Sequence, residues 1–285
     1  MQSSRIAEWL SAGPLLADGA WGTEFQKRGL PPGECPDLWN LAHPDRVEAV
    51  ASAYCDAGSR IILTNTFRAN AISLPEADIR AVNRAGAEIS RRAARGRARV
   101  AASIGPSGKM LLAGDITAEA LSAAFAAQAQ ALADAGADAL LVETMSDIEE
   151  ARIALRAALT AGLPVVVSFA FDTGRNKDRT MTGATPEQVA AAMAAEGADA
   201  VGANCGTGIQ SFAAVCRRLH AACDLPVWIK PNAGLPVMEN GQLTYRTTPA
   251  EFAAYVPGLI EAGASFIGGC CGTSPAFIEA MAPCI

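Results

Sequence analysis

The sequence predicts an α/β fold: a single (β/α)8 TIM barrel over residues 1–285, with a short final helix. Eight short apolar, β-branched segments alternate with Ala-rich segments whose apolar residues recur with the helical 3.6-residue period. Several helical segments end in Gly and lead directly into the next strand, which is typical of loops between helices and parallel strands. Eight such units fit this barrel. A doubly wound open sheet is the alternative, but no G-x-G-x-x-G pattern follows the first strand.

The elements follow one another in a regular order. The predicted strands are residues 14–17, 60–64, 99–103, 138–142, 164–169, 199–202, 226–230 and 264–268. The clearest helical patterns between them are residues 45–57, 118–135, 149–161, 186–196 and 249–262. Thr185 and Thr248 each precede a Pro and are expected to cap their helices. The final helix is expected to begin near Pro275.

The composition excludes several kinds of protein. A net charge of −6 argues against nucleic acid or an anionic membrane as the main partner. No segment approaches the roughly 20 apolar residues of a membrane span, and Glu8 and Asp18 interrupt any signal-peptide core. Eight cysteines would suit disulfides in a secreted protein, but Cys270 and Cys271 are adjacent in a Gly-rich turn. Reduced thiols in a cytoplasmic protein are therefore the favoured interpretation.

Three cysteines have the placement of metal ligands. Residues 268–273 read GGCCGT and residues 202–206 read GANCG. Adjacent cysteines do not easily form a disulfide, because their Cα atoms are about 3.8 Å apart and a disulfide prefers about 5.5 Å. Cys205 follows strand six and Cys270 and Cys271 follow strand eight, so all three belong to one rim of the barrel. They predict a Zn²⁺ site with an open fourth position; a redox or structural cysteine cluster is the alternative.

Other polar residues follow strands at the same end, where the active sites of such barrels lie. Glu143 ends an apolar strand, and a buried carboxylate needs a cationic partner, either a ligand amine, which we favour, or an internal Arg. Asp18 is equally well explained as a turn former before Gly19. His43 and His220 lie away from the strand ends, which argues against a His-based metal site or triad. Five arginines are interpreted as a solvated helix end rather than a phosphate site: Arg91, Arg92, Arg95, Arg97 and Arg99.

Taken together, these motifs resemble the homocysteine S-methyltransferase family. The family includes betaine– and S-methylmethionine–homocysteine methyltransferases and the homocysteine-binding module of cobalamin-dependent methionine synthase. The resemblance runs from about residue 15 to residue 280 and rests on six segments: residues 18–24, 64–67, 139–144, 202–205, 232–236 and 268–273. It implies a (β/α)8 barrel in which three cysteines, matching Cys205, Cys270 and Cys271, bind zinc.

The resemblance also implies the reaction and the substrate contacts. Glu143, with Asp18, would hold the amino group of homocysteine, and backbone amides near Asp18, Gly19 and Thr64 would hold its carboxylate. A free thiol has a pKa of about 8.5, so binding to zinc would supply the thiolate that attacks the methyl donor. No catalytic residue beyond the zinc site is expected, and the product would be methionine.

The methyl donor is the open question. Betaine-using relatives surround the quaternary ammonium with aromatic side chains, and this chain has Arg68 and Thr144 at two of those positions, with Trp21 and Trp39 as the nearby aromatic residues. Residues 64–67, 231–236 and 272–273 are more similar to methionine synthase. Methylcobalamin on a separate corrinoid protein is therefore slightly favoured over S-methylmethionine, S-adenosylmethionine or betaine. A zinc- and homocysteine-binding subunit that is inactive without a partner protein is an alternative of another class.

Overall fold

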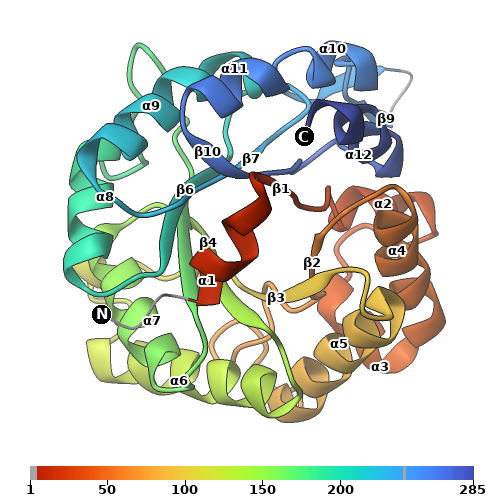
Figure 1. The fold of residues 1–285 in the computed structure, drawn as a ribbon. Helices are drawn as coiled ribbons and strands as arrows, with labels where there is room; N and C mark the ends of the chain where they lie inside the picture. The colour runs from red at the N-terminus through yellow and green to blue at the C-terminus, as the bar shows by residue number, and fades with distance from the viewer. Residues whose placement is uncertain (1–4, 240–241) are drawn as a thin grey trace.

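The computed structural model describes residues 5–239 and 242–285, and its centre is a ring of eight parallel strands surrounded by helices (Figure 1). The strands of the ring are β1 (Leu15–Leu16), β2 (Ile61–Leu63), β3 (Arg99–Ile104), β4 (Ala139–Met145), β5 (Val165–Phe169), β6 (Ala200–Cys205), β7 (Val227–Pro231) and β10 (Ala264–Ile267). They are hydrogen-bonded in the order β1-β10-β7-β6-β5-β4-β3-β2. A parallel bridge between Ala17 and Ile61 joins β1 to β2 and closes the ring. The predicted (β/α)8 barrel is confirmed.

Helices connect the strands and cover the outside of the ring (Figure 1). They are α2 (Gly22–Lys27), α3 (Trp39–Ala42), α4 (Pro44–Asp56), α5 (Ile79–Ala94), α6 (Ala118–Asp134), α7 (Ile148–Leu159), α8 (Pro186–Ala195), α9 (Phe212–Ala222), α10 (Pro249–Ala253), α11 (Val256–Glu261) and α12 (Pro275–Met281), while α1 (Arg5–Trp9) precedes β1. Thr185 and Thr248 form capping boxes with Gln188 and Glu251, as their spacing predicts. The short final helix is also present as α12.

The structure differs from the sequence prediction at several boundaries. Strand β6 continues to Cys205 rather than ending at residue 202, so this cysteine is held by the sheet itself. The predicted helix over residues 249–262 is divided into α10 and α11. An antiparallel hairpin of β8 (Val237–Glu239) and β9 (Gln242–Thr244) lies between β7 and α10 and was not predicted. No helix among the described residues is long and apolar enough to cross a membrane.

Apolar side chains also fill the inside of the ring. Ile6 of α1 packs with inward-facing residues of the strands, including Ala17, Leu141, Trp228 and Phe266. Figure 1 shows α1 lying across one end of the ring of strands. Because these side chains occupy that end, the opposite end, where the strands finish, is the one left for a site.

We expect Ile6→Ala to lower the free energy of unfolding by about 2–5 kcal/mol, because the deleted carbons leave a cavity among fully buried side chains. Glu8→Ala, on the exposed part of the same helix, is the matched control and should change stability by less than about 0.5 kcal/mol. Denaturant unfolding of both variants measures the difference. Equal losses in the two variants would show that α1 does not stabilise the barrel interior.

Candidate functional site

The thiols of Cys205, Cys270 and Cys271 meet at the C-terminal end of the barrel. Their sulfur atoms all lie within 4.8 Å of one another, and those of Cys205 and Cys270 are 3.1 Å apart. None of the three forms a disulfide. Strand β7 brings them together, because Pro231 pairs with Cys205 on one side and accepts a 2.8 Å hydrogen bond from the Cys270 N–H on the other.

The backbone around these thiols is held in unusual conformations. Cys205 has a φ of +62°, in the left-handed region that non-glycine residues rarely adopt. Gly272, with a φ of +83°, turns the chain after Cys271, and a Cβ there would lie 2.2 Å from the ring of Tyr245. Thr273 donates two hydrogen bonds to the Cys270 carbonyl, from its N–H (3.1 Å) and its hydroxyl (2.8 Å). Strain of this kind is typical of functional sites, where the surrounding structure enforces it.

The three thiols fit a zinc ion. Ligand sulfurs about 2.3 Å from a tetrahedral zinc lie about 3.8 Å apart, so the observed cluster needs only small adjustments. Hydrogen bonds from Cys205 and Cys270 lower the pKa of Cys271, while the hydrogen bond with Cys270 raises the pKa of Cys205. A metal cation bound to the cluster would displace the thiol protons that remain. Within the described residues the cluster consists of these three candidate ligands, one fewer than the four of a closed tetrahedral zinc site.

Glu143 lies in the same cavity as the thiols. It belongs to β4, is 7% exposed, and accepts a 2.5 Å hydrogen bond from the Ser103 hydroxyl on β3. Burial raises the pKa of Glu143 to about 7, although the positive charge of Lys230 acts to lower it. Thr64 accepts a 3.0 Å hydrogen bond from the Ser103 N–H, so its hydroxyl supports the residue that orients Glu143.

Asp18 is buried and surrounded by donors. Its Oδ1 is paired with the Nζ of Lys230, and its Oδ2 accepts hydrogen bonds of 2.7 Å from Trp21 Nε1 and from the Leu63 N–H. Lys230 is therefore the cationic partner of Asp18, whereas Glu143, for which a ligand amine or an internal Arg was expected, forms no ion pair among the described residues. The signal in the sequence was a lysine at the end of an otherwise apolar strand, the same signal that had marked Glu143.

Gly19 keeps the loop after β1 close to the turn that carries the cysteines. A Cβ at this position would lie 2.8 Å from both the Thr273 hydroxyl and the Tyr54 hydroxyl. The next residue, Ala20, donates its N–H to the Thr273 hydroxyl at 3.1 Å. Any larger residue at position 19 would push the loop away from the cysteines.

These groups line one cavity of about 240 Å³. Around it lie the three cysteines with Gly19, Thr64, Glu143 and Lys230, and also Trp21, Phe67, Arg68 and Thr144. Asp18 itself is covered by its partners rather than facing the cavity. The suggestion that Trp39 is available to a donor is wrong, because it is 1% exposed and packs on Phe25. Phe67 lines the cavity, as Trp21 does.

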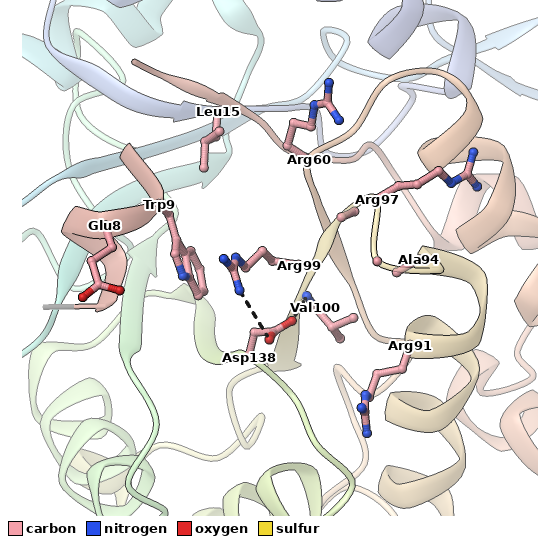
Figure 2. A pocket seen from close by; sticks show the side chains of 12 residues that line it. Glu8, Trp9, Leu15, Arg60, Arg91, Ala94, Arg97, Arg99, Val100 and Asp138 are labelled. Atoms are coloured by element: carbon pink, nitrogen blue, oxygen red, sulfur yellow. Dashed lines mark hydrogen bonds and ion pairs between the residues drawn. The ribbon is translucent and has the colours of Figure 1, made fainter. Parts of the chain in front are cut away.

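A larger cleft of about 600 Å³ opens at the opposite, N-terminal end of the strands (Figure 2). Its arginines have partners: Arg99 pairs with Asp138 at 4.0 Å and lies over the ring of Trp9, and Arg97 pairs with Asp56 at 2.7 Å. The interpretation as a helix end holds for Arg91 and Arg92, which lie in the last turn of α5, whereas Arg99 is the first residue of β3. The thiols and Glu143 make the smaller cavity the candidate active site.

The protein is a closed (β/α)8 barrel. A cluster of free thiols and a buried glutamate lie at the C-terminal ends of its strands. Residues 15–285 match the family model described as homocysteine S-methyltransferase. The chain belongs to the homocysteine S-methyltransferase family, as its motifs predicted.

Two kinds of relative align with the chain. The methionine synthases of Mycobacterium leprae (strain TN) and Mycobacterium tuberculosis (strain ATCC 25618 / H37Rv) are each 33% identical over 98% of this chain. The chain spans about a quarter of their length, 25% in both cases. The homocysteine S-methyltransferase of Escherichia coli (strain K12) is 31% identical, over 94% of both proteins. The metallated form of the homocysteine methyltransferase MmuM from Escherichia coli is similar in structure, with a TM-score of 0.80, 28% identity, and coverage of 98% of this chain and 99% of that one.

Another buried carboxylate, Asp37, lines the cavity. It is 1% exposed and accepts a 2.7 Å hydrogen bond from the Arg68 N–H. Burial raises the pKa of Asp37 to about 6. A carboxyl with a raised pKa binds its proton more tightly in the folded than in the unfolded protein, so it lowers stability as the pH rises through the interval between the two pKa values.

We expect Asp37→Asn to remove this part of the pH dependence. Between pH 5 and pH 7.5 the wild-type protein should lose about 1 kcal/mol of unfolding free energy that the variant keeps, because one pKa unit corresponds to about 1.4 kcal/mol. Denaturant unfolding at the two pH values measures it. Parallel pH profiles for the two proteins would mean that Asp37 is not buried as a charged group above pH 6.

Proposed function

We propose that the chain is a zinc-dependent homocysteine S-methyltransferase that makes methionine. The observation that carries this proposal is the sharing of one cavity by three clustered thiols and Glu143. A small amino acid with a thiol can place its sulfur at the cluster and its ammonium group at the carboxylate at the same time. The free state of all eight cysteines supports a reducing location such as the cytoplasm.

Each group has a distinct part in this proposal. Cys205, Cys270 and Cys271 would hold the zinc, which when bound supplies a position at which a thiol loses its proton and stays nucleophilic. Glu143, oriented by Ser103, would hold the substrate ammonium group. With two points of the substrate held, its sulfur is directed at the donor methyl group, and this positioning is the main contribution of the protein. The thiol proton would be released to solvent when the sulfur binds the metal, and transfer of the methyl group to the thiolate then moves no further proton.

The proposed donor is methylcobalamin carried by a separate corrinoid protein. Alignment of nearly the whole chain with a part of the methionine synthases supports it. The cavity wall has Arg68 and Thr144 where a betaine cage would have aromatic rings. S-methylmethionine and S-adenosylmethionine are the alternative donors, supported by the match with the homocysteine S-methyltransferase of similar length. Turnover assays with S-methylmethionine, with S-adenosylmethionine and with a methylated corrinoid protein distinguish these donors.

A second candidate is a zinc- and homocysteine-binding subunit that is inactive without its partner. The alignment of the chain with one part of the longer methionine synthases supports a barrel that works together with other domains or proteins. Binding of homocysteine with no turnover of any free donor, and turnover on addition of a corrinoid protein, would identify this candidate.

We expect Cys271→Ala to abolish zinc binding and activity while leaving the barrel folded, because the apolar core does not depend on the cluster. Loss of a residue that hydrogen-bonds to a metal ligand typically lowers activity about 10–100-fold, and loss of a ligand itself should lower it further. Metal analysis and circular dichroism on protein purified under reducing conditions measure this, with Cys223→Ala as the control outside the cluster. One zinc per chain in the variant would overturn the ligand assignment.

We expect Glu143→Gln to weaken homocysteine binding about 10–100-fold, the value of a charge-assisted hydrogen bond, with zinc content unchanged. Calorimetric titration of the zinc-loaded proteins measures the affinity. X-ray absorption at the zinc edge should show a sulfur added by homocysteine in both proteins. An unchanged affinity in the variant would remove Glu143 from the substrate site.

A further inference from the structure

Lys230 is a buried charge that the proposed function does not yet use. It stands near the end of β7, with its side chain 2% exposed. Its Nζ is paired with Asp18, whose side chain is fully buried. Lysine is rarely buried unless it is paired, because removing the ammonium group from water is costly. The ion pair with Asp18 offsets the cost of burying Lys230. Lys230 also lines the cavity, so it can contact a ligand there.

Asp18 already has a cationic partner within the protein, Lys230. Its two oxygens together receive three donors: Lys230, the indole N–H of Trp21 and the N–H of Leu63. The ammonium group of Lys230 thus occupies the place beside Asp18 that the family resemblance assigns to the amino group of homocysteine. The substrate ammonium group is left with Glu143.

Glu143 is suited to that ammonium group. In the described part of the chain its recorded partner is the Ser103 hydroxyl, on Oε1. No basic side chain in that part forms an ion pair with it, and Glu143 is one of the residues that line the cavity.

The carboxylate of an amino acid sits on the same carbon as its ammonium group, so it needs a partner close to Glu143. Several backbone N–H groups nearby are already used: Ala20 donates to Thr273, Leu63 to Asp18 and Ser103 to Thr64. Lys230 lines the cavity together with Glu143 and the cysteines. Its ammonium group has three donors, and Asp18 is its recorded hydrogen-bond partner among the described residues.

We propose that Lys230, held in place by Asp18, binds the carboxylate of the acceptor thiol. This proposal rests on the proposed function, because it takes homocysteine as the substrate. Lys230 and Glu143 then read the two charged groups of the substrate with opposite charges, while its sulfur goes to the cysteine cluster. The chain selects an α-amino acid thiol and discriminates against thiols that lack the carboxylate.

The test compares homocysteine with two thiols that each lack one of its charged groups. 3-Mercaptopropylamine has no carboxylate, and 4-mercaptobutyrate has no amino group. Calorimetry measures the binding of each to zinc-loaded wild-type protein, Lys230→Met and Glu143→Gln. In the wild-type protein the loss of the carboxylate should weaken binding about tenfold or more, as expected for a charge-assisted contact.

The variants then assign that loss to a residue. In Lys230→Met, homocysteine and 3-mercaptopropylamine should bind with nearly equal affinity, and the preference for homocysteine over 4-mercaptobutyrate should remain. Glu143→Gln is the matched control and should show the opposite pattern. Zinc content should be the same in all three proteins. A preference for the carboxylate that survives in Lys230→Met would overturn the assignment and leave Lys230 as a partner of Asp18 only.

Lys230→Met leaves the charge of Asp18 buried without a partner, which could unfold the variant, so a second variant is needed. The double substitution Asp18→Asn with Lys230→Met removes both charges and should show the same loss of carboxylate preference. Its thermal unfolding and zinc content check the fold. Homocysteine that fails to bind the zinc-loaded wild-type protein would overturn the proposed function and this assignment together. Homocysteine that binds, with the preference unchanged by either variant, would overturn the role of Lys230 alone.

Discussion

The hydrogen bonding of strand β7 to the chain on both of its sides is the constraint on which the site depends. At the end of this strand, Pro231 pairs with Cys205 of β6 and accepts a hydrogen bond from Cys270 after β10. Both contacts are made by backbone groups, so the distance between the thiols follows from the register of three parallel strands. A shift of one residue would turn side chains to the other face of the sheet and separate the sulfurs. Ring closure between β1 and β2 holds that register in place.

The same strand also carries the charge that balances the interior of the barrel. Lys230 neutralises Asp18, and the ion pair lies beside a carboxylate, Glu143, that has a hydroxyl partner instead of a cation. Buried charges contribute little to stability when they are paired, and they destabilise a fold when they are not. Burial without a cationic partner raises the pKa of Glu143 to about 7. Under the proposed function, the ammonium group of the substrate would supply the cation that Glu143 lacks.

The relatives of this chain show one barrel in two settings. In the methionine synthases it corresponds to a part of a much longer protein, and in the homocysteine S-methyltransferase of Escherichia coli it corresponds to nearly all of the protein. The thiol cluster and Glu143 line the cavity, and so do Trp21, Phe67 and Arg68. Under the proposed function, the thiol cluster and Glu143 would bind the acceptor thiol. Trp21, Phe67 and Arg68, with any protein that binds over the cavity, would select the methyl donor.

The sequence by itself determined the barrel, its eight strands, the short final helix and the grouping of three cysteines with Glu143. These follow from local periodicity and from the rule that the ends of parallel strands meet on one side of a barrel. The pairing of Lys230 with Asp18, 212 residues apart, was decided only by the tertiary structure. So were the support that Thr64 gives to Ser103, the burial of Trp39 and the division of the helix over residues 249–262. Such contacts depend on side-chain directions and on register between distant strands, and a pattern along the chain carries no information about either.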